Sequence, residues 1–285
     1  MESKKLIFDI GFHKGEDTSY YLHSRYSVVG VDADPSMIQE AKTVFKKELD
    51  SGQLTLLNFA VSDSDDAIVE LNISGWSYWN SLKKNIANRE NKIQYSVKVA
   101  TVRLDTLMRK YGVPYYCKID VEGYDAIAAS TLLKTDYRPE FISVETECTG
   151  QDEILTDEQA LKTLDTLREL GYKEFKLVDQ NSLEVLSLKP FYNVHGPERP
   201  HTFIQKMSNR FFRKPEKNIS NIEQLNRDHN FKFHLYATGP FGNELNGNWF
   251  GYQEAKQMLL MHRKDFFKNK AAKKYSFWCD WHAKM

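Results

Sequence analysis

The sequence has few cysteines, no excess of charge of either sign and no long apolar run. Its three cysteines, Cys117, Cys148 and Cys279, are scattered and odd in number, which excludes a disulfide framework and a thiolate metal cluster. We therefore expect a reducing, cytoplasmic setting. Lys and Arg total 39, as do Asp and Glu. Without a basic excess, the bulk attraction that nucleic-acid binding needs is not expected.

A signal peptide and a membrane-spanning run are also missing from the sequence, so we expect no membrane partner. What is present is a chain of 285 residues, 41% of them apolar and 13% aromatic. This composition is typical of a globular protein with a substantial core. Its length suits one large domain, or a domain with an appendage. The oligomeric state is not indicated.

Short apolar runs alternate with helical periodicity over the first 180 residues. This rhythm predicts a doubly wound, Rossmann-like α/β fold with a mostly parallel sheet. A final antiparallel strand is expected at residues 231–238, followed by a helix at 252–267. We expect a core at 1–180, an excursion or lid at 181–230, and a strand, helix and tail packed on the core at 231–285. The other predicted strands are 5–10, 27–32, 54–61, 67–73, 95–102, 115–120, 141–145 and 173–178, and the other helices are 16–24, 35–49 (with Met37, Ala41, Val44 and Phe45 on one side), 104–111, 124–133 and 157–170.

The segment FDIGFHKG at residues 8–15 has the pattern of a strand, a glycine turn and a helix. Gly11 permits a tight turn and a close approach of ligand to backbone, and Gly15 opens a helix whose free N–H groups face the ligand. Asp9 is placed to accept a hydrogen bond from a cationic amino group or to orient the loop. His13 replaces the middle glycine of the dinucleotide fingerprint, which disfavours a pyrophosphate and suits a methionine moiety. Alone, the segment is equally an ordinary turn.

Two further strand ends suggest an adenosine site. Asp32 lies 21 residues after Gly11, where a Rossmann unit carries the acid that binds ribose hydroxyls. The alternative is a surface carboxylate at a strand end. At residues 58–63, Phe59, Ala60 and Val61 supply an apolar slot for adenine.

The segment KIDVEGY at residues 118–124 ends the predicted fourth strand. Strand alternation puts Lys118, Asp120 and Glu122 on one side, where three charges are costly unless they are paired or functional. The alternative is a structural ion pair between Lys118 and Glu145. In open α/β sheets, ligands bind beyond the carboxyl ends of the strands, so this segment is expected in the site.

Together these blocks resemble the FkbM-type methyltransferase family over roughly residues 5–180. The matching stretches are DIG at 9–11 with Gly15, VDADP at 31–35, NFAVSD at 58–63, VRLDTL at 102–107, KIDVEG at 118–123 and FISVE at 141–145. The resemblance implies S-adenosylmethionine as cofactor. His13 departs from the Asn usual at its place. The donor-binding residues so implied are Asp9, Gly11, His13, Gly15, Asp32, Ala33, Ala60, Val61 and Asp120.

The resemblance also implies methylation of hydroxyl groups, often on sugars or natural products, so we expect a small-molecule or glycan acceptor. Such an enzyme aligns the acceptor oxygen and removes its proton. The candidate catalytic bases are Glu122, Asp120 and Glu145, with His195 and His201 as further possibilities. The loop WSYWNS at 76–81 offers Trp76, Trp79 and Asn80 for stacking on and hydrogen bonding to a sugar, or else packs against the C-terminal tail.

A magnesium ion is a second possibility for the same acids. Catechol O-methyltransferases hold magnesium with acids at the ends of the fourth and fifth strands, and Asp120, Glu145 and Glu147 lie at loosely similar places. The alternative is that these acids only orient the cofactor and the strands.

Two competing functions remain. An NAD-dependent oxidoreductase is disfavoured by the missing middle glycine and by the lack of an evident hydride-transfer dyad. A nucleic-acid methyltransferase is disfavoured by the zero net charge and by the lack of a base-flipping motif after the fourth strand.

Overall fold

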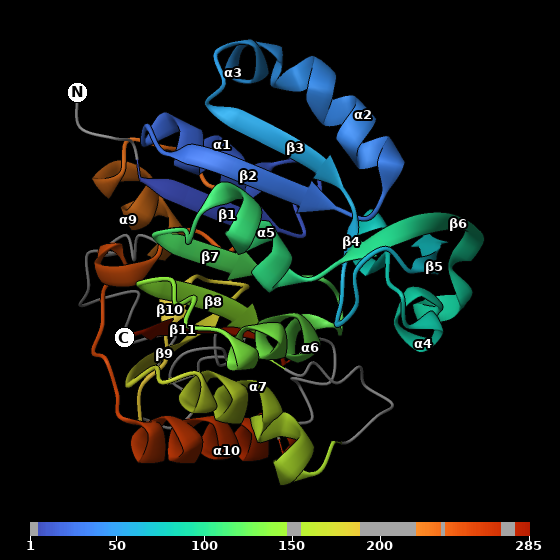
Figure 1. The fold of residues 1–285 in the computed structure, drawn as a ribbon. Helices are drawn as coiled ribbons and strands as arrows, with labels where there is room; N and C mark the ends of the chain where they lie inside the picture. The colour runs from blue at the N-terminus through green and yellow to red at the C-terminus, as the bar shows by residue number, and fades with distance from the viewer. Residues whose placement is uncertain (1–4, 147–154, 189–220, 235–236, 269–276) are drawn as a thin grey trace, which may run out of the picture.

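The computed structural model describes residues 5–146, 155–188, 221–234, 237–268 and 277–285 (Figure 1). Its centre is an eight-stranded sheet, whose five strands on one side are mutually parallel. The predicted doubly wound, mostly parallel sheet with an antiparallel last strand is therefore confirmed. In spatial order the strands are β10 (Glu184–Val185), β9 (Glu174–Asp179), β11 (Cys279–Lys284), β8 (Phe141–Glu145), β7 (Tyr116–Ile119), β1 (Leu6–Ile10), β2 (Ser27–Asp32) and β3 (Leu54–Asn58).

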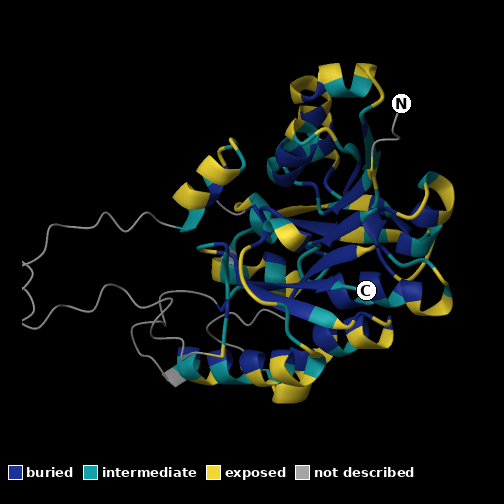
Figure 2. Ribbon diagram, turned by 90° about the vertical axis from the view of Figure 1, so that its left-hand side faces the viewer, coloured by how far each residue is buried: buried dark blue, intermediate teal, exposed yellow. Residues whose placement is uncertain are grey.

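Helices cover both faces of this sheet because its strands are apolar on both sides. In β1, Phe8 and Ile10 pack into one core, and Ile7 packs into the other. The strands are consequently the most buried part of the molecule, and the exposed residues lie on the outer sides of the helices (Figure 2). The first core is closed by α5 (Leu104–Tyr111), α6 (Asp125–Ser130), α7 (Asp157–Glu169) and α10 (Tyr252–Lys268), and the second by α1 (Glu16–His23), α2 (Pro35–Val44) and α9 (Asn221–Asp228).

A small second sheet projects from the body between β3 and α5 (Figure 1). It consists of β4 (Ala60–Val61), β5 (Ile68–Ser74) and β6 (Ile93–Val102), in the order β4-β6-β5. The strand predicted at 54–61 is therefore two strands. The chain leaves the large sheet after Asn58, and Ala60–Val61 pairs with the end of β6 instead. This insertion carries the Trp- and Asn-rich loop, which includes a short α4 (Lys84–Ala87).

The strand predicted at residues 231–238 is wrong for the residues that the structure describes there. Residues 231–234, 237 and 238 form no strand, and the backbone N–H groups of Thr238 and Gly239 donate to the carboxylate of Asp17. The antiparallel strand is β11, between β8 and β9. In β11 the apolar residues Trp281 and Ala283 alternate with the polar residues Asp280 and His282, although all four side chains are buried. Strands that are buried on both faces are usually apolar throughout, so the sequence does not indicate a buried strand here.

The helix predicted at 35–49 is interrupted at Phe45, and α3 (Lys46–Asp50) follows as a separate turn. Its buried side is formed by Ile38, Ala41 and Phe45. Val44, which the spacing predicts on the same side as Ala41 and Phe45, is 63% exposed. The other predicted elements have counterparts within a few residues, although the helix predicted at 124–133 ends in a 3-10 turn. None of the described helices has the length and apolar character needed to cross a bilayer.

Candidate active site

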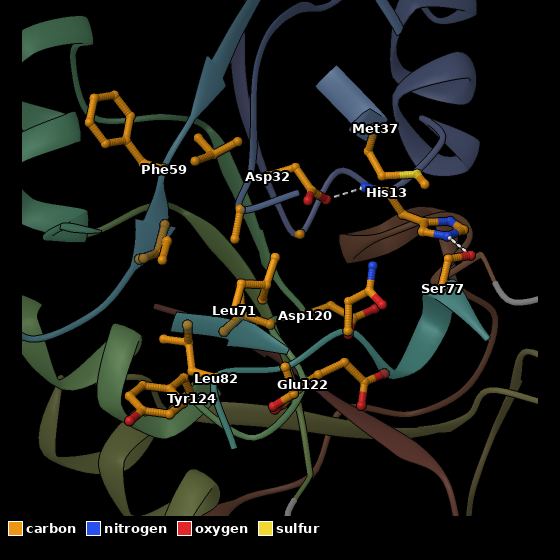
Figure 3. Close-up of a pocket in the computed structure, with 18 of the residues that line it drawn as sticks. His13, Asp32, Met37, Phe59, Leu71, Ser77, Leu82, Asp120, Glu122 and Tyr124 are labelled. Atoms are coloured by element: carbon orange, nitrogen blue, oxygen red, sulfur yellow. Dashed lines mark hydrogen bonds between the residues drawn. The ribbon is translucent and has the colours of Figure 1, made fainter. Parts of the chain in front are cut away.

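A pocket opens at the carboxyl ends of β1, β2 and β7. It lies at the switch point of the large sheet, where β1 has β2 on one side and, on the other, β7, which the chain reaches after β3. The pocket encloses about 730 Å³, its mouth included. Its wall combines strand ends of the large sheet with the insertion, as Figure 3 shows. The large sheet contributes Gly11, His13, Asp32, Ala33, Asp120 and Glu122, and the insertion contributes Ala60, Val61, Leu71, Ser77, Tyr78, Asn80, Ser81 and Leu82.

Gly11 brings the β1 loop into contact with the end of β7. Its φ is +85°, and a Cβ built on it would lie 1.6 Å from the carbonyl oxygen of Asp120. Neither the backbone conformation nor the space permits a side chain. Gly11 therefore holds two walls of the pocket against each other.

Asp32 is held in place by two backbone N–H groups. Its Oδ2 accepts from the N–H of His13 at 2.7 Å, and its Oδ1 accepts from the N–H of Asp34 at 2.8 Å. Burial raises the pKa of Asp32 to about 6, although both hydrogen bonds oppose the rise. Each carboxylate oxygen can accept a second hydrogen bond. The pair of oxygens thus suits two vicinal hydroxyl groups.

His13 adopts a left-handed backbone conformation with φ 49°. Its ring Nδ1 lies 2.9 Å from Glu16 Oε1, and its Nε2 lies 2.8 Å from Ser77 Oγ. The ring also packs on Tyr78 at 4.4 Å between centroids. His13 therefore connects the β1 loop to the insertion across the mouth of the pocket.

An apolar slot follows β3, as predicted. Phe59, Ala60 and Val61 line it, and Leu71 and Leu82 of the insertion close it from the other side. Ala60 and Val61 are almost completely buried. The slot lies near Asp32 in Figure 3, so an aromatic ring and a polyhydroxy group can bind side by side.

Three carboxylates gather beyond β7 and β8. Oxygens of Asp120, Glu122 and Glu145 all lie within 4.8 Å of one another. Asp120 and Glu122 line the pocket, whereas Glu145 is buried and is not among the lining residues. Burial and the charge of Asp120 raise the pKa of Glu122 well above its ordinary value, and burial with the charge of Glu122 does the same for Glu145. Such a group can share protons or attract a cation.

Lys118 lies beneath the pocket and pairs with three acids. Its Nζ is 3.3 Å from Asp9 Oδ1, 3.4 Å from Asp17 Oδ2 and 3.7 Å from Asp120 Oδ2. It also donates to the carbonyl of Gly11 at 3.1 Å. Lys118 and Asp120 of this segment are therefore paired, and Lys118 ties the β1 loop to Asp120 in the pocket.

Two residues predicted to bind the donor do not line the pocket. Asp9 is fully buried, and its carboxylate binds Lys118 and the hydroxyl of Thr18. Of its two predicted roles, only the orientation of the loop is available to it here. A Cβ on Gly15 would lie 2.6 Å from the ring of Phe12, so this glycine serves packing.

The aromatic residues predicted to bind the acceptor lie outside the pocket lining. Trp76 and Trp79 stack on each other at 5.6 Å, and Trp76 is half exposed. Asn80 does line the pocket and donates to Asp34 Oδ2. Sequence reasoning missed Ser77, Tyr78, Ser81, Leu82 and Met37, although the first three stand in or directly beside the tryptophan segment. The candidates His195, His201 and Glu147 fall outside the described residues.

The arrangement fits an adenosine that carries an amino-acid tail. Asp32 offers acceptors to ribose hydroxyls, and the slot of Phe59, Ala60 and Val61 is apolar. At the other end, the carboxylate of Asp120 can face a cation, with the carboxyl group of Glu122 beside it. A 2′-phosphate would meet the carboxylate of Asp32 and be repelled.

A search of curated proteins finds no match. Solved structures that this chain is similar to include a methyltransferase domain of bacterial CtHen1 (13% identity, 61% of this chain and 80% of that chain, TM-score 0.38), an S-adenosylmethionine-dependent methyltransferase from Geobacter sulfurreducens bound to S-adenosyl-L-homocysteine (11%, 99% and 85%, 0.38) and phosphoethanolamine N-methyltransferase 2 of Haemonchus contortus (12%, 100% and 49%, 0.37).

A profile of the methyltransferase FkbM domain matches residues 9–174, which is more than half of the chain. The matched range contains the end of β1 and all of β2 to β8, and with them every described residue that lines the pocket. The chain therefore belongs to the FkbM methyltransferase family.

Proposed function

We propose that this protein transfers a methyl group from S-adenosylmethionine to a hydroxyl oxygen of a sugar, a glycan or another small metabolite. One observation carries the proposal: in a member of the FkbM family, Asp32 stands at one end of a pocket and the acids Asp120 and Glu122 stand at the other. The spacing of these groups suits a donor with a ribose at one end and a cationic amino-acid tail at the other. The donor supplies a methyl group that its sulfonium sulfur has already activated.

The residues of this chain supply orientation and a proton acceptor. Asp32 holds the ribose, and the slot of Phe59, Ala60 and Val61 holds the adenine. Lys118 pairs with Asp120 and so fixes it beside the pocket. Glu122 takes the proton of the acceptor hydroxyl, because burial and the charge of Asp120 make it a stronger base than an ordinary carboxylate. Glu145 lies behind Glu122 and shares its protons.

Binding of magnesium is the less favoured role for the same acids. Three carboxylate oxygens within 4.8 Å would suit a hard cation, but the raised pKa values of Glu122 and Glu145 are equally explained by shared protons. We assign Asp120, Glu122 and Glu145 to proton handling. Methyl transfer that survives dialysis against EDTA supports this assignment, and loss that magnesium restores would refute it.

The acceptor we propose is neutral. Apart from two tyrosines, the described ionisable side chains that line the pocket are His13, Asp32, Asp120 and Glu122, so a phosphorylated or carboxylated acceptor would face acidic groups. Asn80 remains a candidate for binding it. We place the activity in the cytoplasm, which the free, buried thiols of Cys117 and Cys279 support.

The test has two stages. Calorimetry with S-adenosylmethionine, S-adenosylhomocysteine and NAD should give binding of the first two only. A screen with isotopically labelled donor should then transfer label to a glycan or hydroxylated metabolite, with oligonucleotides as a second arm. Binding of NAD instead of the sulfonium donor would refute the proposal. If only the oligonucleotides became labelled, the acceptor would be a nucleic acid instead of a glycan or a small metabolite.

A further inference from the structure

The insertion loop, residues 75–82, is tied to three separate loops of the large sheet. Ser77 Oγ lies 2.8 Å from His13 Nε2, after β1. Asn80 Nδ2 donates to Asp34 after β2, and Ser81 Oγ donates to the carbonyl of Glu122 after β7. Each of these partner loops also lines the pocket. The insertion loop thus forms a wall of the donor pocket, and its position depends on these contacts.

Of these three contacts, the one made by Ser77 depends on the ring of His13, which also binds Glu16. Glu16 accepts from His13 at Nδ1, and this hydrogen bond lowers the pKa of Glu16, although burial opposes it. Glu16 is therefore a carboxylate that only accepts, so Nδ1 carries the ring proton. In the neutral ring, Nε2 must then accept from the hydroxyl of Ser77. Ser77 Oγ keeps its own lone pairs for another partner.

His13 also orders the next residue of the loop. Its ring packs on Tyr78 at 4.4 Å with an interplanar angle of 37°. Ser77 and Tyr78 both line the pocket, and neither contacts the large sheet through a strand pairing. Asn80 and Ser81 also bond this loop to the large sheet, through contacts that involve neither Ser77 nor Tyr78.

We infer that His13 is a positioning residue that holds Ser77 and Tyr78 as the outer wall of the donor pocket, with Ser77 Oγ as an acceptor for a hydroxyl or ammonium group of the donor. This inference rests on the proposed function and deepens it. The donor site is then completed by the insertion, and retention of donor and product depends on the chain Glu16–His13–Ser77.

Two amide substitutions of His13 test separately the hydrogen bonds that its ring makes at Nδ1 and at Nε2. His13→Asn places a polar atom near Nδ1 and keeps the bond to Glu16, but it is too short for Ser77. His13→Gln extends a polar atom toward the place of Nε2 and can keep the bond to Ser77. Because Asn tolerates φ 49° better than Gln, backbone strain alone predicts the opposite order of effects.

The experiment measures the dissociation rate of S-adenosylhomocysteine from the full chain by stopped-flow displacement. His13→Asn and Ser77→Ala should each speed dissociation about tenfold, the effect of one lost hydrogen bond. The double variant should also be about tenfold faster, because both changes remove the same contact. His13→Gln should stay within about threefold of the parent. The matched control is Ser96→Ala, on β6 of the same insertion, where the hydroxyl donates to Asn72; it should change nothing.

A second readout needs no ligand. Hydrogen exchange at residues 76–81 of the free protein should accelerate in His13→Asn and Ser77→Ala, and not in Ser96→Ala. Effects that multiply to about a hundredfold, a parent-like His13→Asn, or an equal effect of Ser96→Ala would overturn the inference. If the parent protein binds neither donor nor product, the proposed function fails; unchanged exchange in the variants would show that the positioning role fails by itself.

Discussion

Gly11 occupies a position at which the surroundings permit no side chain. Gly11→Ala would place a methyl group 1.6 Å from the carbonyl oxygen of Asp120, so the β1 loop and the end of β7 must separate. Gly52 is a matched control, because its φ of +73° is similar and nothing lies within 4 Å of its Cβ. We expect Gly52→Ala to cost about 1 kcal/mol of unfolding free energy. Gly11→Ala should cost more, and donor affinity should fall only there; equal effects in denaturation and calorimetry would contradict this.

Asp32 should contribute to donor affinity through its charge. Asp32→Asn keeps the shape of the side chain. Its amide N–H₂ group, however, faces one of the two backbone N–H groups that donate to the carboxylate, so that hydrogen bond is lost. We expect donor affinity to fall about 10- to 100-fold, the effect of a lost charged hydrogen bond. Asp63→Asn, at an exposed acid outside the pocket, is the control. Equal affinities of the two variants in calorimetry would remove Asp32 from the donor site.

Glu122 should act more strongly on the rate than on donor binding. Glu122→Gln removes the proton acceptor, so kcat should fall about 10²- to 10⁴-fold. In the parent, a raised pKa means that Glu122 becomes protonated, and activity declines, at a higher pH than for an ordinary carboxylate. The variant should lose this acidic limb of the pH–rate profile. Unchanged turnover on the identified acceptor would exclude Glu122 as the base.

At the scale of elements, β11 is fixed by one large side chain. Trp281 is fully buried between its strand neighbours and packs edge-on against Phe175 at 6.4 Å. We expect Trp281→Ala to cost about 3–5 kcal/mol. Met285→Ala, just beyond the strand and 46% exposed, should stay within about 0.5 kcal/mol. A small loss for Trp281→Ala in urea denaturation would mean that β11 adds little to the sheet.

The elements show where sequence patterns suffice. Continuous apolar runs such as 27–32 and 141–145 predict buried parallel strands, and their bounds match β2 and β8. β11 escapes the same reasoning because Asp280 and His282 are buried polar residues. The glycine turn and Asp32 were predictable as parts of the site, since their backbone geometry follows a local pattern. The wall formed by Ser77 and Tyr78 was not, because it depends on where the insertion folds back.

The whole molecule gathers acids at one end of the sheet, and its stability should depend on pH accordingly. Burial raises the pKa of Asp9 to about 7 and that of Asp125 to about 7, and it raises those of Glu122, Glu145 and Asp280 as well. An acid with a raised folded-state pKa binds more protons when folded, so stability falls as pH rises from the unfolded value near 4 through the folded value.

We therefore expect the ligand-free protein to be less stable at pH 8 than at pH 5, by about 2 kcal/mol or more. Urea denaturation at several pH values measures this. Glu145→Gln should make the slope shallower, because it removes one titrating group from the cluster. A stability that rises from pH 5 to pH 8 would show that these acids are ionised at no cost in the folded protein.

The position of β11 in the sheet has a consequence for folding during synthesis. Because residues 279–284 lie between β8 and β9, these two strands face each other across a gap until that segment has emerged from the ribosome. For the time needed to make about a hundred further residues after β9, both strands carry open edges that can recruit strands of other nascent chains. Expression of this protein should therefore benefit from chaperones that shield open strand edges.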